Sequence, residues 1–174
     1  MEEQFIEITD GKILDRETKI LKITRMHRNF EKITDPFQPV QPASDHVLQI
    51  LRRNSYKCNN VIQVKDYNED FVYVGWIEGK PLVNLSPIDS WMHESSLPIN
   101  FTEISKGVKW LHSNGIAHLD IRAKNILVTE EGTPILIDIL GAQPLDEEKR
   151  LRDLKDLRNL EEELLYTWYN RVTY

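Results

Sequence analysis

Short runs in which apolar and polar residues alternate occupy the first 75 positions, and this alternation is the pattern of half-buried β-strands. Turn-forming residues follow the first run at 10–11 and separate the last two runs at 66–70. Between the second and third runs, Ser44 or Asp45 is placed to cap a helix whose apolar residues include Val47 and Leu51. The sequence therefore predicts a small antiparallel sheet with one helix, and its strands are 5–9, 20–24, 61–64 and 71–74.

Apolar residues beyond position 82 are spaced as in helices instead. One helical run is predicted around 88–93 and a stronger one over 101–112, where Ile104, Val108 and Leu111 share a face. Two apolar runs, 126–128 and 135–137, flank a turn at 130–133 and predict a hairpin. The chain is therefore expected to be α+β, with 75–81 connecting its two parts. A final amphipathic helix is predicted over 146–169, with these leucines at helical spacing: Leu154, Leu157, Leu160 and Leu164.

Length and composition narrow the classes of protein. A chain of 174 residues with 40% hydrophobic residues can bury one good core, so we expect a single domain. The net charge of −6 and the scattered basic residues do not indicate a nucleic-acid partner or an anionic membrane surface. Cys58 is the single cysteine, which fits a reducing, cytoplasmic setting. No apolar run is long enough to cross a bilayer and no basic flank precedes one, so we expect a soluble protein without a targeting segment.

The polar residues with the clearest chemical meaning lie in two neighbouring turns. Asp120 is followed five residues later by Asn125, and Asp138 comes thirteen residues after that, where the second hairpin strand ends. Taken singly, each is more often a solvated or turn-forming residue. Together they offer a carboxylate that can orient a hydroxyl and two oxygen ligands of the kind that Mg²⁺ prefers. Phosphoryl transfer needs mainly such positioning and charge neutralisation, so these residue types are compatible with that reaction.

These residues resemble the catalytic loop of protein kinases, His-Arg-Asp-x-x-x-x-Asn, with its metal-binding Asp-Phe-Gly after a short hairpin. The resemblance implies that Asp120 is the catalytic base or orienting group and that Asn125 and Asp138 bind Mg²⁺. It places Arg122, where such kinases usually have Lys, against the transferring phosphate. His118 is expected to be a structural hydrogen-bonding residue.

The same resemblance implies a minimal bilobal protein-kinase-like fold that binds ATP between two lobes. The N-lobe is expected over about 1–75, the hinge over about 75–81, and a reduced, mostly helical C-lobe over about 82–174. Lys22 matches the strand lysine that touches the nucleotide phosphates, although strand alternation lets it face solvent equally well. The backbone of Gly75, Trp76 and Ile77 matches the hinge that hydrogen-bonds an adenine.

Several departures from the kinase pattern point to an atypical member. Gly11 is the only glycine before Lys22, so no glycine-rich loop covers the phosphates. The helix after Lys22 has no glutamate to pair with that lysine, and its Asp45 is either the partner of Lys22 or only a cap. Few residues separate Gly141 from the last helix, which leaves no room for a long activation segment. The run 156–161 resembles the central helix of minimal kinases, namely RIO kinases and the kinase subunit of the KEOPS complex. In those minimal kinases a helical aspartate supports the catalytic loop, and Asp156 matches it here unless it is only a solvated charge.

Three functions are compatible with this pattern. The first is an ATP- and Mg²⁺-dependent atypical Ser/Thr-type protein kinase or ATPase, whose acceptor the sequence does not identify. The second is a small-molecule kinase of the aminoglycoside or choline type, which has the same loop but usually extra helices around its substrate. The third is a pseudokinase that acts as a binding partner of another kinase or protein complex and transfers no phosphate.

Overall fold

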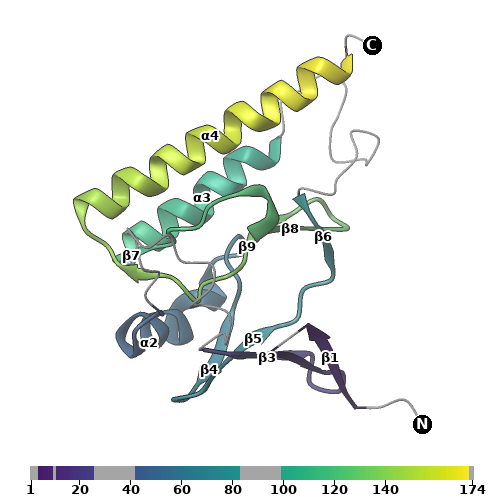
Figure 1. The fold of residues 1–174 in the computed structure, drawn as a ribbon, viewed down its shortest axis with the longest axis vertical. Coiled ribbons are helices and arrows are strands. Elements are labelled where there is room, and N and C mark those ends of the chain that lie inside the picture. Colours follow the sequence, from purple (N-terminus) through teal and green to yellow (C-terminus); the bar gives the residue numbers. More distant parts are fainter. Residues whose placement is uncertain (1–3, 10, 26–41, 83–98, 173–174) are drawn as a thin grey trace.

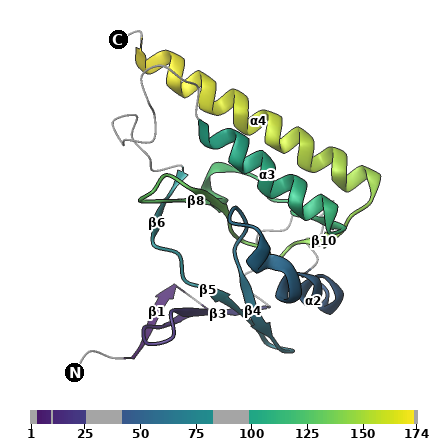
Figure 2. The same cartoon turned by 180° about the vertical axis from the view of Figure 1, so that it is seen from behind.

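The computed structural model describes residues 4–9, 11–25, 42–82 and 99–172. A five-stranded sheet with helix α2 (Asp45–Asn54) at its side forms one part of the molecule, and two long helices with two small sheets form the other (Figure 1). The reverse view shows the same separation, with α3 and α4 side by side on the far side from the large sheet (Figure 2). The structure is thus α+β, as predicted.

The large sheet is antiparallel throughout and has the order β1-β2-β3-β5-β4. Strand β2, with its polar ends, was not predicted from the sequence. The predicted strand 61–64 is wrong in its bounds, because Val61 and Ile62 pair with Leu136 of another sheet and β4 begins only at Val64. The strands are β1 (Phe5–Thr9), β2 (Lys12–Asp15), β3 (Ile20–Thr24), β4 (Val64–Tyr67) and β5 (Phe71–Gly75).

Helix α2 forms where the sequence predicted it. Ser44 is its N-cap, and its hydroxyl accepts a hydrogen bond from the Val47 N–H at 3.4 Å. Val47, Leu48 and Leu51 turn inward and are fully buried. The helix thus packs its apolar face against the sheet and the core, and this fixes where its first residues lie.

The second part of the chain confirms the predicted helix and hairpin. Helix α3 (Ile99–Ser113) buries Ile104, Val108 and Leu111 on one face. The hairpin consists of β8 (Ile126–Thr129) and β9 (Pro134–Leu136). Strand β6 (Gly79–Pro81) joins β8, although a plain connector was predicted there, and β7 (Ile116–Ala117) pairs with β10 (Gln143–Pro144). The helical run predicted around 88–93 lies outside the described residues.

Helix α4 (Glu147–Val172) is one continuous helix, as predicted from the leucine spacing. Leu160 is buried, and Leu157 and Leu164 pack partly against the core. Leu154, the first leucine of that spacing, is 38% exposed. Its neighbour Asp153 lies on the face shared with Leu157 and Leu160 and is fully buried instead.

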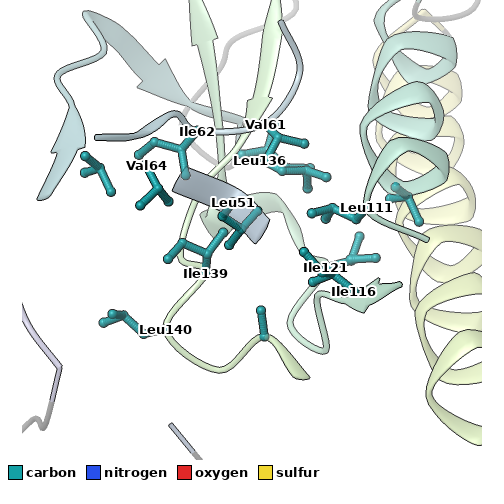
Figure 3. Close-up of a cluster of buried hydrophobic side chains, with 14 of the residues drawn as sticks. Leu51, Val61, Ile62, Val64, Leu111, Ile116, Ile121, Leu136, Ile139 and Leu140 are labelled. Atoms are coloured by element: carbon teal, nitrogen blue, oxygen red, sulfur yellow. The ribbon is translucent and has the colours of Figure 1, made fainter. Parts of the chain in front are cut away.

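One continuous core joins the two parts. Figure 3 shows Leu51 of α2, Leu111 of α3 and Ile139 after β9 in the same cluster, to which Val61 and Ile62 also belong. This packing holds the loop after β7 and the turn after β9 close to the start of α2. Among the described residues, no helix is long and apolar enough to cross a membrane.

Candidate active site

The loop that follows β7 is held in place by a buried histidine. His118 is fully buried, its Nδ1 accepts the Asp120 N–H at 3.1 Å, and its Nε2 lies 2.8 Å from the carbonyl oxygen of Ile137. Since Nδ1 accepts a hydrogen bond, the proton belongs on Nε2, which donates to Ile137. Both ring nitrogens are thus used by backbone groups, which agrees with a structural role for His118.

A carboxylate on α4 supports the same loop from the core side. Asp153 accepts the N–H of His118 at 2.9 Å and that of Leu119 at 2.8 Å, and its Oδ2 lies 2.8 Å from His112 Nε2. Leu119 has φ of +68°, a left-handed backbone conformation that costs a leucine free energy. The two hydrogen bonds from Asp153 therefore stabilise a strained turn directly before Asp120.

This position corrects the prediction that Asp156 supports the loop. Asp156 lies one turn further along α4 and is only partly buried. Burial raises the pKa of the Asp156 carboxyl, the nearby Arg152 lowers it, and the charges of Asp153 and Asp120 raise it further. The supporting carboxylate is Asp153, and the sequence contains its signal: Asp153, Leu157 and Leu160 share one helix face, so a charge stands at an apolar position.

Asp120 and Asn125 are in direct contact. The amide Nδ2 of Asn125 donates to Asp120 Oδ2 at 2.7 Å and to the Asp120 carbonyl at 2.9 Å. Asn125 is buried, whereas the Asp120 side chain is 35% exposed. With its nitrogen turned to Asp120, Asn125 keeps its Oδ1 for another partner, and a cation is a partner that an amide oxygen suits.

Arg122 lies against the same carboxylate. Its Nε is 2.7 Å from Asp120 Oδ1, and its Nη2 donates to Asp120 Oδ2 at 3.3 Å. The Arg122 side chain is 55% exposed, so the pair sits at the solvent edge of the site. Ion pairs in this setting contribute at most about 1 kcal/mol, and an arriving substrate group can replace this one at low cost.

Asp138 is exposed and has φ of +58°, the second left-handed residue of the site. The residue before it, Ile137, is held at both backbone groups: its N–H donates to the Asn125 carbonyl at 2.9 Å, and its own carbonyl accepts from His118. Asp138 therefore follows directly after a residue bonded to the loop of Asp120 and Asn125. In the part of the chain that the structure describes, no cluster of three or more His, Cys, Asp or Glu side chains is placed to hold a metal.

Lys22 lies on the face of the large sheet that is turned away from the core. It pairs with Tyr73 in the register, and the residues on either side of it pair with Val74 and Val72, which are fully buried. Directly paired residues share a face, so Lys22 points away from the core. Its Nζ lies 3.9 Å from the ring centroid of Phe71, a cation–π contact. This register does not support the predicted role of Lys22 as a phosphate anchor.

The ion pair between the sheet and α2 is made by another residue, which the sequence reasoning missed. Arg25, directly after β3, has its Nη1 2.8 Å from Asp45 Oδ1, and its side chain is 14% exposed. The partner expected for Asp45 was Lys22, whereas the structure pairs Asp45 with Arg25, and Ser44 is the cap. The strand alternation held a signal for this pair, because Arg25 has the same parity as the buried Ile23.

Backbone pairing in the N-terminal part leaves few backbone groups free for the predicted contacts with a nucleotide. Thr9 pairs with Lys12, which leaves a two-residue connection and no long loop between β1 and β2. In the expected hinge, the N–H of Gly75 donates to Gln63 at 3.0 Å and the N–H of Trp76 to Lys19 at 2.9 Å. Two of the three hinge donors are therefore used within the protein.

A sheet with one helix, a mainly helical second part, and a loop in which an asparagine is hydrogen-bonded to an aspartate agree with the domain that the sequence predicted. The model of the protein kinase domain family matches residues 9–157, so this chain belongs to that family. Its fold is a truncated, kinase-like version of the bilobal architecture.

Curated relatives agree with the family. The chain is 44% identical over 107 residues, 61% of its length, to a probable serine/threonine-protein kinase of Dictyostelium discoideum, and the match covers 21% of that protein. It is 31% identical over 105 residues to serine/threonine-protein kinase STK11 of Gallus gallus, over 56% of this chain and 23% of that one. The mitogen-activated protein kinase p38a of Drosophila melanogaster is 26% identical over 140 residues, 74% of this chain and 38% of its own length. The chain thus spans about a fifth to two fifths of the length of these relatives.

Proposed function

We propose that this chain binds ATP with Mg²⁺ and transfers the γ-phosphoryl group to a hydroxyl, as a Ser/Thr-type protein kinase. The observation that carries this proposal is the hydrogen-bonded unit of Asp120 and Asn125, joined to Asp138 through the Asn125–Ile137 backbone bond. The curated relatives named as serine/threonine-protein kinases support this choice of acceptor class.

The residues fit a magnesium site of the kind completed by a nucleotide. Mg²⁺ is commonly held by one or two protein oxygen ligands together with phosphate oxygens and water. Asn125 Oδ1 and the Asp138 carboxylate would be those two ligands, since Asn125 has its nitrogen turned to Asp120. When bound, the cation neutralises charge on the phosphate oxygens.

Asp120 would receive the acceptor hydroxyl. Its carboxylate is held by Asn125 on one oxygen and by Arg122 on the other, and its exposed fraction of 35% leaves it open to solution. The hydroxyl replaces Arg122 at Oδ1 and is oriented toward the phosphate, and Asp120 accepts its proton. The released guanidinium can then bind an oxygen of the transferring phosphoryl group.

The adenine would lie at the hinge. Gly75 and Trp76 use their N–H groups inside the sheet, so we assign the donor to Ile77 and the acceptors to the carbonyls of this segment. We further infer that the kinase is of the atypical, minimal kind. Only Leu145 and Asp146 separate β10 from α4, so the chain here is far shorter than a usual activation segment.

Incubation with γ-labelled ATP and Mg²⁺ tests the proposal. Label transfer or ATP loss should fall at least about 100-fold in Asp120→Asn and in Asp138→Asn, because each removes a group that acts on the transferring phosphate. Glu148→Gln removes an exposed carboxylate from α4 and is the matched control that should keep full activity. Activity that survives Asp138→Asn would contradict the metal assignment.

A second candidate is a binding module that has the kinase fold and transfers no phosphate. The position of Lys22 favours the binding module, because this lysine, which in kinases lies beside the nucleotide phosphates, is not on the core face of β3. The two candidates differ in nucleotide binding, which should stabilise a kinase by about 2.7 kcal/mol at 100 times the dissociation constant. A parent protein whose melting temperature does not change with ATP and Mg²⁺ would favour the binding module.

A further inference from the structure

Three segments that are distant in the sequence meet at the main chain of Ala43, just before α2. The Ala43 carbonyl accepts a hydrogen bond from Arg25 Nη2 at 3.1 Å. The Ala43 N–H donates to the carbonyl of Leu140 at 2.7 Å, and Ala43 is 4% exposed. One buried peptide segment thus connects the end of β3 with the turn that follows Asp138.

The guanidinium of Arg25 binds three groups at once. Besides the Ala43 carbonyl, it pairs with Asp45 at 2.8 Å and donates from Nη1 to the Asn68 carbonyl at 2.7 Å. The Arg25 backbone is also fixed, because its N–H donates to the Asp70 carbonyl at 2.8 Å. Because the Arg25 side chain is only 14% exposed, its charged guanidinium makes these hydrogen bonds shielded from much of the solvent.

Leu140 belongs to the tight turn that contains Asp138. Its neighbour Ile139 is 2% exposed and accepts the Ala142 N–H at 3.1 Å. On the other side of Asp138, Ile137 is held by Asn125 and His118. The residues before and after Asp138 are therefore both fixed by hydrogen bonds, which keeps Asp138 in its left-handed conformation. After Asp138, the bond from the Ala43 N–H to the Leu140 carbonyl is the one that connects the turn to α2.

We propose that Arg25 is a positioning residue for Asp138: through Ala43 it holds the start of α2 in the place where Leu140, two residues after Asp138, is bound. This rests on the proposed function for the role of Asp138 and extends it to a residue that touches neither nucleotide nor metal. Arg25 and Asp45, rather than Lys22, couple the sheet to the helix and to the site.

Site-resolved amide hydrogen exchange tests the coupling without any ligand. In Arg25→Ala, the Ala43 amide should exchange about tenfold faster, since a lost hydrogen bond to a charged group is worth about that factor. The Ala142 amide should also exchange faster, because the turn after Asp138 loses its anchor. Arg25→Lys keeps the charge but cannot reach three acceptors, so its rates should lie between those of the parent and Arg25→Ala.

Arg52→Ala is the matched control. Arg52 also ties α2 to the sheet, through Asp66 at 3.4 Å, but at the other end of the helix and on an exposed surface. It should leave the rates of Ala43 and Ala142 unchanged, and the Val108 amide in α3 should be unchanged in all variants. Unchanged Ala43 rates in Arg25→Ala would overturn the proposal. So would faster exchange at Ala43 alone, or equal effects in Arg52→Ala.

A magnesium titration gives the functional readout. The Mg²⁺ concentration for half of the ATP-induced thermal shift should rise at least about threefold in Arg25→Ala, while ATP binding without metal is unchanged, because only the hold on Asp138 is weakened. An unchanged magnesium requirement would reduce Arg25 to a structural role and overturn the proposal. If the parent protein shows no ATP-induced shift, the proposed function fails, and the exchange rates of Ala43 and Ala142 alone then decide whether Arg25 positions the turn.

Discussion

Replacing Asp153 with asparagine is the sharpest test of how the site is supported. The carboxylate is fully buried and accepts three hydrogen bonds, from the backbone of His118 and Leu119 and from the His112 ring. Asparagine has the same size, but it loses the charge and turns an NH₂ group toward at least one donor. The donor that meets this NH₂ group would be left buried and without its acceptor.

The magnitude follows from these contacts. A buried donor without an acceptor costs about 1–3 kcal/mol, and each hydrogen bond to a charged group contributes about 1.5–3 kcal/mol. Asp153→Asn should therefore lower the free energy of unfolding by about 3–5 kcal/mol. For a chain of this size, about 2–4 °C per kcal/mol corresponds to a melting temperature lower by about 6–20 °C.

Urea unfolding followed by tryptophan fluorescence measures the loss, since the chain has four tryptophans. Asp156→Asn is the matched control, the same substitution one turn along the same helix, and it should cost no stability. A loss below about 1 kcal/mol in Asp153→Asn, or equal losses in the two variants, would refute the assignment of Asp153 as the support of the loop.

Three further predictions address single residues. Burial raises the pKa of Asp156 in the native state, so the parent protein binds this proton more tightly when folded and loses stability as the pH rises through that pKa. Asp156→Asn should therefore unfold at a higher temperature than the parent at pH 7. The difference should vanish at a pH below the pKa values of both the folded and the unfolded state. Lys22→Ala should remove only the contact with Phe71, about 0.5–1 kcal/mol of stability, and leave the ATP-induced thermal shift unchanged; a lost shift would mean that Lys22 reaches the nucleotide. His118→Phe keeps the ring volume but leaves the Asp120 N–H and the Ile137 carbonyl without partners. It should lower the free energy of unfolding in urea by about 2–4 kcal/mol and speed the exchange of the Asp120 amide. A stability equal to the parent's would contradict the role of His118.

Local signals in the sequence predicted much of the fold. Helix α2 was predictable because a capping serine precedes an apolar stripe, and α3 because Ile104, Val108 and Leu111 repeat at helical spacing. Strands β6, β7 and β10 were not predictable, since each has only two or three residues and exists through pairing with a distant segment. The bounds of β4 were wrong for the same reason, because Val61 pairs with the distant Leu136.

The site divides in a similar way. The resemblance of the loop spacing to that of protein kinases predicted the grouping of Asp120 with Asn125. The structure shows them hydrogen-bonded, while their catalytic roles stay predictions. Alternation left both faces open to Lys22, and only the register with β5 places it away from the core. The family resemblance pointed to Asp156, whereas the supporting carboxylate is Asp153, which is buried on the apolar face of α4.

The two-residue link between β10 and α4 has a consequence for control of this protein. A kinase switched by phosphorylation needs a long loop beside its catalytic aspartate that folds when the phosphate meets an arginine. Here Pro144 is followed almost at once by Glu147 of α4, and leucine stands before Asp120 in place of arginine. Neither the loop nor its receptor is present between Asp138 and α4, so we do not expect phosphorylation at this place to switch the site.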